Sequence, residues 1–421
     1  MKITFSRAII FLALSLYSIG SAHAGQFEDG VSAYSRGEYE IALHEILPLA
    51  QSGRADAQYI VGNIYENGLG VQKDLTKAFT WYQQSAAQGY LDAENILGDM
   101  YADGSGTLKD SVEAVKWYRK AAENGHALAQ LNLGFMYDNG FGVVQDFGQS
   151  MQWYLRSAQQ GNATAQENLG VMYASGQGVA INPQEALKWH MLAAEQGLAA
   201  AQNSLGVIFE NGLGAPVDLE KSIQWYKLAS DQGNAAAQFN LATMYENGKG
   251  TNKDLKIAQE QYFLSAAQNY PPAQFKLGTI FDEGNGIAKD YTEAVKWYQL
   301  AANQSYALAQ LNLGNMYDEG LGVQKDASEA AKWYLKAADN HLPLAQLNFG
   351  KMLETGSGIP KNVIEAGLWY KLATLGFQNN DKNQENEAIR AHDRIVNAFS
   401  VEEKQLYNKM ETSWLLEHSK K

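Results

Sequence analysis

The chain repeats one pattern every 36 residues, and this period constrains its fold more than any other feature. A tryptophan recurs in one register, with Gln261 as the single exception, at Trp81, Trp117, Trp153, Trp189, Trp225, Trp297, Trp333 and Trp369. A glycine recurs in a second register, with Ala242 as the exception, at Gly62, Gly98, Gly134, Gly170, Gly206, Gly278, Gly314 and Gly350. Such a period is typical of stacked helical hairpins, each of which packs mainly on its neighbours. We therefore predict an all-α solenoid.

Residues 126–161 illustrate how the first half of each repeat is expected to fold. Ala129, Leu133 and Tyr137 recur at three- and four-residue spacing, which predicts one helix with a buried stripe. Gly134 lies inside this helix, where glycine costs about 1 kcal/mol relative to alanine. Its recurrence needs a reason, and we expect it to allow close approach of the second helix.

The second half of the repeat begins with a turn. Gly140 and Gly142 are expected to adopt left-handed conformations that end the first helix and form the turn. Asp146 occupies the position of an N-cap for a second helix that carries Trp153 as its large apolar residue. The same cap position is filled elsewhere by Asp74, Asp110, Asn182, Asp218, Asp254, Asp290 and Asp326.

The repeated pattern A-x-A-Q-x-x-L-G-x-x-Y-x-x-G-x-G-V-x-x-D-x-x-x-A-x-x-W-Y-x-x-A-A-x-x-G resembles the Sel-one-like repeat, a relative of the tetratricopeptide repeat. Residues 306–341 show it clearly, and the resemblance extends over nine units within residues 54–377. The resemblance implies a right-handed superhelix of antiparallel helix pairs, with the first helices lining a concave face. It also implies an adaptor or scaffold and not an enzyme. Exported bacterial members of this family are linked to envelope processes or to contact with host cells.

The N-terminal residues 1–24 have the pattern of a signal peptide. Lys2 and Arg7 precede an apolar stretch, and Ala22-His23-Ala24 resembles a cleavage site. The apolar stretch is short for a membrane helix, and no later segment reaches spanning length. Removal of Lys2 and Arg7 would change the net charge from −13 to −15. We therefore predict a soluble bacterial protein that is periplasmic or secreted, and its acidity argues against nucleic acid as a ligand.

Both ends of the repeat array are predicted to carry caps. Residues 25–53 keep the repeat register without the glycine-rich loop, as expected for an N-terminal tetratricopeptide-like hairpin. Residues 378–421 are predicted to form a polar linker, from Asn379 to Asn386, and two capping helices. The first of these runs from Ala388 to Phe399, and a capping box of Ser400 and Glu403 opens the second, which extends to about Glu417. An alternative role for the last helix is docking of a partner through Trp414 and Leu415-Leu416.

The sixth repeat departs from the pattern because it has Ala242 and Gln261 in place of the usual glycine and tryptophan. Pro271 and Pro272 open the following repeat. Two interpretations remain: neutral drift in a tolerant repeat, or a change of curvature or hinge between residues 233 and 275.

The sequence offers no constellation for catalysis, metal binding or cofactor binding. There is no cysteine, which excludes disulfides and thiolate chemistry. None of the seven histidines lies in an HExxH motif or at ligand spacing, and His190 takes the place of a repeat tyrosine, where packing is expected. The G-x-G pairs follow predicted helices and not strands, so they are turns and not phosphate loops. We predict that the chain is not an enzyme.

The positions that vary within the fixed pattern are the candidate partner-binding residues. They are expected to line the groove of first helices, as an aromatic and aliphatic floor beside a row of acids at the helix ends. The floor residues are Tyr59, Leu131, Phe135, Phe239, Phe275, Leu311 and Leu347, and the acids are Glu66, Asp103, Asp138, Glu210, Glu246, Asp282, Glu283, Asp318 and Glu319. Two interpretations of these acids remain: solvated turn residues, or a binding role. Negative charge at a helix C-terminus opposes the helix dipole and is mildly unfavourable for stability, so the recurrence of acids there supports a binding role.

We predict an exported, non-enzymatic adaptor that binds a protein or peptide with basic residues and apolar anchors. One alternative is a secreted factor that binds a host protein during infection. Two others are a peptidoglycan-associated enzyme or wall-binding protein and an adaptor of the endoplasmic reticulum. The sequence identifies neither the partner nor the oligomeric state.

Overall fold

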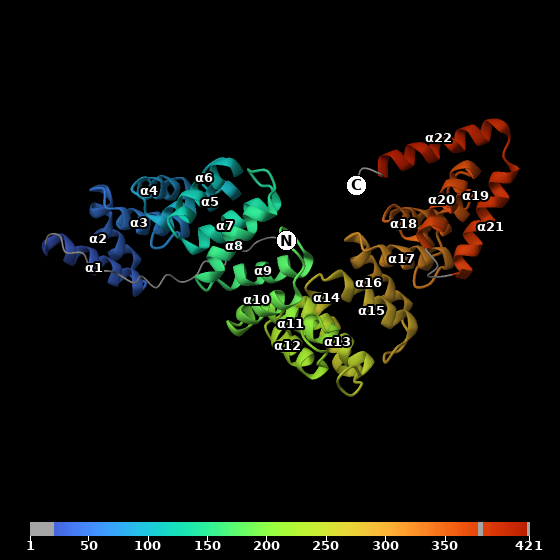
Figure 1. Ribbon diagram of the computed structural model, residues 1–421, viewed down its shortest axis with the longest axis horizontal. Helices are drawn as coiled ribbons and strands as arrows, with labels where there is room; N and C mark the ends of the chain where they lie inside the picture. Colours follow the sequence, from blue (N-terminus) through green and yellow to red (C-terminus); the bar gives the residue numbers. More distant parts are fainter. Residues whose placement is uncertain (1–20, 378–381, 419–421) are drawn as a thin grey trace. The chain divides into compact units, whose positions relative to one another are not determined.

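The structure, a computed structural model, describes residues 21–377 and 382–418, which contain 22 α-helices and no β-strand (Figure 1). The chain divides into two compact units, residues 1–196 and 197–421. Unit 1 contains α1 (Ser21–Ser35), α2 (Tyr39–Gln51), α3 (Ala55–Asn67), α4 (Leu75–Ala87), α5 (Leu91–Asp103), α6 (Ser111–Glu123), α7 (Ala127–Asn139), α8 (Phe147–Gln159), α9 (Ala163–Ser175) and α10 (Pro183–Glu195).

Unit 2 contains the remaining helices. They are α11 (Ala199–Asn211), α12 (Leu219–Asp231), α13 (Ala235–Asn247), α14 (Leu255–Ala267), α15 (Pro271–Glu283), α16 (Tyr291–Asn303), α17 (Ala307–Glu319), α18 (Ala327–Asp339), α19 (Pro343–Thr355), α20 (Val363–Phe377), α21 (Lys382–Ala398) and α22 (Val401–His418). Within each unit, successive helices pack on one another in sequence order. The predicted all-α solenoid of 36-residue helix-turn-helix repeats is confirmed.

Helix boundaries follow from caps that recur in every repeat. Asp146 accepts a hydrogen bond from the backbone N–H of Gln149, and every other predicted aspartate or asparagine cap bonds in the same way at the start of its helix. Gly140 ends α7 with φ of +69°, and Gly142 has the same φ in the turn. A side chain is disfavoured in this left-handed region, which explains why glycine recurs at both offsets.

The glycine inside each first helix allows the second helix to approach closely, as predicted. A methyl group on Gly134 would lie 2.6 Å from Cδ1 of Tyr154, well inside van der Waals contact. The ring of Tyr154 is buried, and in most other repeats the residue after the tryptophan is an equally buried tyrosine. Ala242 replaces the glycine in the sixth repeat, yet Tyr262 is still buried there. The sixth repeat therefore accommodates one extra methyl group.

Tyrosine, more than tryptophan, fills the core of the repeats. Trp153, Trp333 and Trp369 are buried, whereas the tryptophans of the other repeats are half-buried. Trp333 packs in a cluster with Leu313 of α17, while its neighbour Tyr334 packs with Leu347 of α19. Adjacent residues of α18 thus belong to successive clusters, which is how neighbouring repeats share one continuous core.

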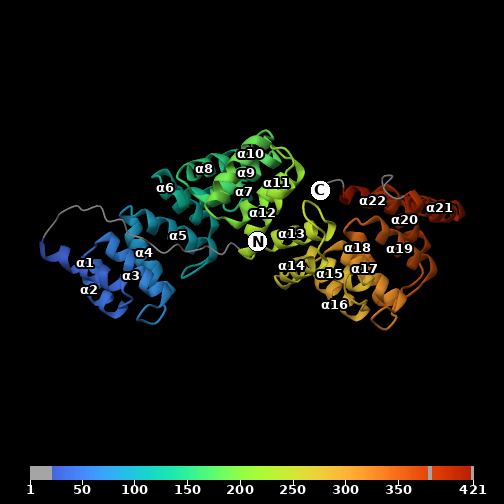
Figure 2. The ribbon, with the colours of Figure 1, turned by 90° about the horizontal axis from the view of Figure 1, so that it is seen from below.

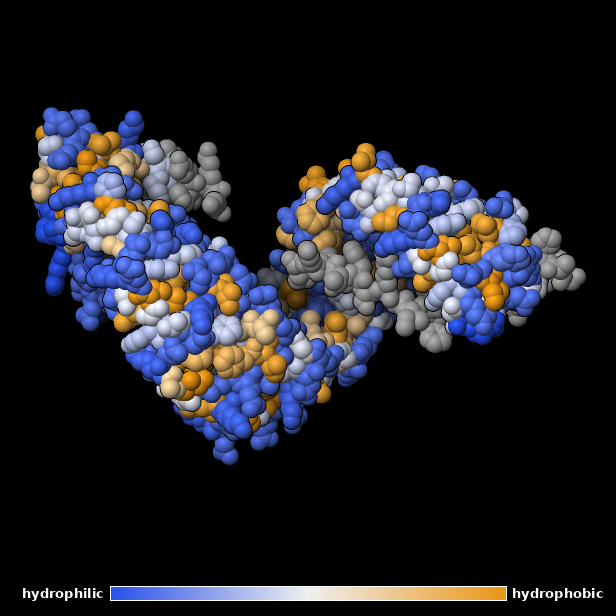
Figure 3. Space-filling view, turned by 180° about the vertical axis from the view of Figure 1, so that it is seen from behind, coloured by the Kyte–Doolittle hydropathy of each residue, from blue (hydrophilic) through white to orange (hydrophobic). Residues whose placement is uncertain are grey.

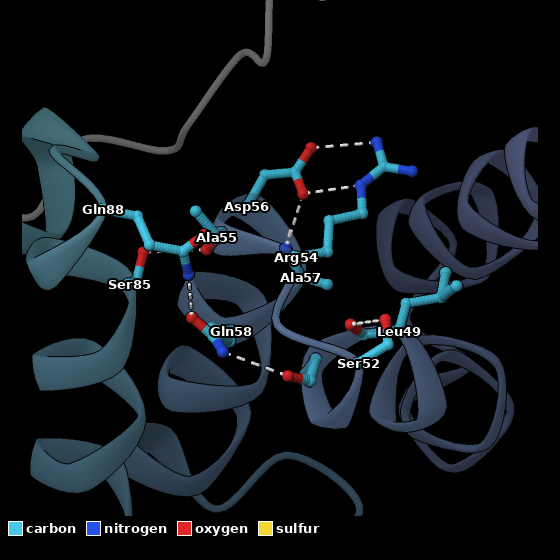
Figure 4. Close-up of polar contacts among 10 residues, drawn as sticks. Leu49, Ser52, Arg54, Ala55, Asp56, Ala57, Gln58, Ser85 and Gln88 are labelled. Carbon is cyan, nitrogen blue, oxygen red and sulfur yellow. Dashed lines mark hydrogen bonds and ion pairs between the residues drawn. The ribbon is translucent and has the colours of Figure 1, made fainter. Parts of the chain in front are cut away.

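A glutamine at the fourth position of most first helices joins neighbouring hairpins by hydrogen bonds. Figure 4 shows the first of these connections. The Gln58 side chain donates to the carbonyl oxygen of Ala50, at the end of α2, over 3.1 Å. Its own oxygen accepts from Gln88, which follows α4, over 2.7 Å. We call this arrangement the glutamine clip. Both bonds recur around Gln130, Gln166, Gln238, Gln274 and Gln310.

Additional helices flank the repeats. In unit 1, α1 and α2 form a hairpin before the first repeat. Most of the predicted signal peptide, residues 1–24, lies outside the described residues. In unit 2, α21 and α22 both pack on α20 (Figure 2). Helix α21 begins at Lys382 and not at Ala388, so all of the described part of the predicted linker, residues 382–386, is helical.

The predicted capping box before α22 is confirmed. Ser400 donates its backbone N–H to the Glu403 carboxylate over 2.8 Å, and Glu403 donates its own N–H to the Ser400 hydroxyl over 3.2 Å. The boundary between the compact units falls after Gln196. Whether the sixth repeat reflects neutral drift or a change of curvature within residues 233–275 stays a prediction. Among residues 21–377 and 382–418, no helix is long and apolar enough to cross a membrane.

Candidate binding face

The predicted partner-binding residues all lie on the first helices of the repeats, but their exposure differs. Four floor residues are half-buried: Leu131, Phe135, Phe239 and Phe275. Three acids are exposed, Asp103, Glu283 and Glu319, and four are half-buried, Asp138, Glu210, Asp282 and Asp318. We call these accessible residues the first-helix face. Its part in unit 1 comprises Asp103, Leu131, Phe135 and Asp138, and its part in unit 2 comprises the other seven.

Three predicted floor residues are buried instead of accessible. Tyr59 is 4%, Leu311 5% and Leu347 0% exposed. The Tyr59 ring lies 5.6 Å from that of Tyr82 and 5.1 Å from that of Tyr90, so it is part of its own repeat's core. The expectation that these three residues are accessible on the groove floor is therefore wrong, and we leave them out of the first-helix face. Periodicity gave their register but not the depth to which neighbouring side chains cover them.

Two predicted acids, Glu66 and Glu246, are also buried, and the structure gives the reason for their recurrence. The Tyr82 hydroxyl donates to Glu66, and the Tyr262 hydroxyl donates to Glu246, each over 2.8 Å. A buried hydroxyl needs a hydrogen-bond partner, and these carboxylates supply it. Glu66 and Glu246 are thus structural partners of the core tyrosines and not part of an exposed acidic row.

The same bond forms in repeats whose acid is half-buried. Tyr226 donates to Glu210 over 2.7 Å, and Tyr298 donates to Asp282 over 3.2 Å. Burial, followed by the Glu66 charge, raises the pKa of Tyr82 well above its usual value, so this hydroxyl remains a donor at neutral pH. The unfavourable position of these acids against the helix dipole is therefore offset by a hydrogen bond within the repeat.

In unit 2 the face carries two phenylalanines in similar surroundings. The Phe239 ring lies 5.5 Å from Tyr262 and 5.8 Å from Tyr270. The Phe275 ring lies 5.8 Å from Tyr298, one repeat further along. Both rings are held in place by neighbours while part of each remains accessible, which suits them to act as rigid apolar anchors.

Three polar residues that directly follow floor residues in the chain, Asn132, Asn240 and Lys276, were missed by reasoning from the sequence. Asn240 donates to Asn203 on the preceding first helix over 3.0 Å, and Asn132 donates to Asn95 over 3.1 Å. Lys276 pairs with Glu246 over 2.9 Å. The recurrence of asparagine at Asn132, Asn168, Asn240, Asn312 and Asn348 was a visible signal. Carboxamides can both donate to and accept from a polypeptide backbone.

His190 packs in the core, as predicted, and also has a specific partner. It takes the position of the core tyrosine, and a methyl group on Gly170 would lie 2.5 Å from its Cε1. Its Nδ1 lies 2.6 Å from Oε2 of Glu167, which is likewise buried. In this repeat a histidine thus replaces the tyrosine, and its partner is a glutamate at the register of Tyr59 instead of that of Glu66.

The face of the molecule in Figure 3 has separate hydrophobic patches among hydrophilic residues. Within the described part of the chain, no group of three or more histidine and acidic side chains is placed to hold a metal ion. The accessible face provides rings, amides and carboxylates, which can form contacts and hydrogen bonds with another chain.

Comparison with known proteins agrees with the repeat architecture. The Sel1 repeat model matches nine consecutive segments, residues 55–90, 91–126, 127–162, 163–198, 199–234, 235–270, 271–306, 307–342 and 343–375. A protective antigen of uropathogenic Escherichia coli with an SLR fold is 29% identical, with a TM-score of 0.57 over 93% of this chain and 91% of that one. A Sel1 repeat protein from Oxalobacter formigenes is 33% identical, with a TM-score of 0.54 over 57% of this chain and 96% of that one. No curated protein matches the chain.

Proposed function

The chain belongs to the Sel1 repeat family, and from this premise we propose that it is an exported adaptor that binds a polypeptide along its first-helix face. Repeats of this family mediate protein interactions. A solenoid suits this function because each added repeat extends the surface along which another chain can lie. The proposed activity is binding and not catalysis.

The observation that carries the proposal is the pair of accessible phenylalanines, Phe239 and Phe275, at the same position of consecutive repeats. They are held by core tyrosines, so little side-chain entropy is lost when a partner covers them. Asn240 directly follows Phe239 and is hydrogen-bonded to Asn203, and carboxamides of this kind can also bond to a backbone. The exposed carboxylate of Glu283 in the same unit favours a partner with basic residues.

The test is affinity capture with residues 25–421 from extracts of the producing cell's envelope, before and after the double substitution Phe239→Ala and Phe275→Ala. We expect the captured protein to be lost, because two apolar anchors are removed. A matched control is Leu264→Ala with Leu300→Ala, since these leucines are 51% and 44% exposed on the second helices α14 and α16. Circular dichroism must show that all variants stay helical. Capture that survives the phenylalanine substitutions, or is equally lost in the control, would refute the assignment of the face.

The proposed location is outside the cytoplasm, with residues 1–24 as a signal peptide. Support comes from the similar protein of uropathogenic E. coli, which is a protective antigen. That similarity also favours a second candidate, a secreted protein that binds a host protein through the same face. Fractionation of cells grown alone and with host cells distinguishes the two: mature protein that stays in the periplasm under both conditions excludes the host-directed function.

A further inference from the structure

At the end of unit 2, side chains of helices α19, α20 and α21 line an open surface cavity of about 390 Å³, and most of them are charged. Helix α19 contributes Lys351 and Glu354, and α20 contributes Tyr370. Helix α21 contributes Glu387, Arg390 and Arg394. The lining has three cationic and two anionic groups, so it carries one excess positive charge on a chain whose net charge is −13.

Four of these five charges neutralise one another. The Lys351 ammonium lies 2.7 Å from Oε1 of Glu387. The Arg394 guanidinium donates two hydrogen bonds to Glu354, one of them from Nη2 to Oε2 over 2.9 Å. The Tyr370 hydroxyl donates to the same Oε2 over 2.8 Å. Arg394 holds the pKa of Glu354 below its usual value, so this pair remains ionised at neutral pH.

Arg390 is the remaining cation. It lies three residues after Glu387 and four before Arg394 on α21, it is exposed, and it has no hydrogen bond or ion pair with any described residue. A guanidinium presents a planar fork of donors that matches the two oxygens of a carboxylate. One excess positive charge matches one carboxylate better than a phosphate group, which carries close to two negative charges at neutral pH.

The position of the cavity indicates which carboxylate it would receive. Glu387 lies 36 residues after its partner Lys351, which is the period of the repeat. Helix α21 therefore stands where the first helix of another repeat would stand, and among the described helices it is the last of that row. Lys351 itself occupies the register of Phe135 and Thr243 on earlier first helices. A polypeptide that follows the first-helix face of unit 2 in this direction reaches the cavity at the end of the row.

We propose that this cavity binds the C-terminal carboxylate of a polypeptide held along the first-helix face of unit 2, with Arg390 as the residue that contacts it. The inference rests on the proposed adaptor function and adds a direction to the bound chain: its C-terminus lies at α21. A carboxylate could also come from an aspartate or glutamate side chain of the partner, and the experiment must separate the two sources.

The probes are two fluorescent decapeptide pools with randomised sequence, one with free C-termini and one with C-terminal amides, measured by fluorescence anisotropy against residues 25–421. Wild-type protein is expected to bind the free-carboxylate pool at least about tenfold more tightly, since a charge-assisted bidentate pair is lost on amidation. Arg390→Gln should abolish this difference, and Arg390→Lys should restore it only in part, because lysine keeps the charge without the fork. Lys404→Gln on α22 is the control, since it removes one exposed positive charge away from the cavity.

Several results would overturn the proposal. Equal binding of the two pools, absence of binding to either, or an unchanged preference in Arg390→Gln would each do so. An amidated pool with glutamate near its end that binds as tightly as the free-carboxylate pool would assign the cavity to acidic side chains instead. If both pools bind equally and both lose binding on Phe239→Ala with Phe275→Ala, the adaptor function stands and only the cavity assignment fails.

Discussion

The glutamine clip predicts a specific loss of stability when its buried member is replaced. In unit 1, the Gln130 side chain donates to the Ala122 carbonyl over 3.0 Å and accepts from Gln160 over 2.8 Å. Gln130→Met keeps the volume of the side chain and removes both hydrogen bonds. Each bond contributes about 0.5–1.5 kcal/mol. The Ala122 carbonyl keeps its bond from the Gly125 N–H, so it is not left without a partner, and we expect a total loss of about 1–2 kcal/mol.

The matched control is Gln152→Met on α8, outside the clip. Gln152 is exposed, so its substitution should cost less than about 0.5 kcal/mol. Urea unfolding followed by tryptophan fluorescence gives the overall change, and hydrogen–deuterium exchange of α6, α7 and α8 locates it. A local measurement is needed because neighbouring repeats in an array can unfold separately. Equal effects of the two substitutions, or no faster exchange in these three helices, would refute the role of the clip.

Two further predictions concern the core tyrosines. Burial raises the pKa of residues such as Tyr82, so their contribution to stability is complete below pH of about 10 and is lost as the pH rises toward the folded-state value. The free energy of unfolding should therefore fall above pH of about 10. Ultraviolet absorbance showing that all of the tyrosines, the buried ones included, form phenolate near pH of about 10 in the folded protein would contradict this. Gly206→Ala should destabilise the protein by about 1 kcal/mol. The new methyl group would lie 2.4 Å from Cδ1 of Tyr226, and the cost of this overpacking exceeds the gain in helix propensity. A higher urea midpoint for this variant would show instead that the Tyr226 ring can move aside.

The sequence alone determined the architecture and most of the local structure. The 36-residue period, the aspartate caps and the paired turn glycines correspond to the observed helix starts and ends. The capping box at Ser400 and Glu403 was readable because both of its residues lie within one helical turn. These features depend on residues close together in the chain, so their pattern is enough to predict them.

Only the tertiary structure decided which variable positions are accessible. Leu347 and Phe275 share one register, yet Leu347 is fully buried and Phe275 is half-buried. Glu66 looked like a free acid until the structure placed the Tyr82 hydroxyl beside it, and the cavity around Arg390 requires three helices to meet. Each of these outcomes depends on side chains that come from different helices. Periodicity along one chain fixes a residue's register, whereas its burial and partners are fixed by the neighbours that packing brings to it.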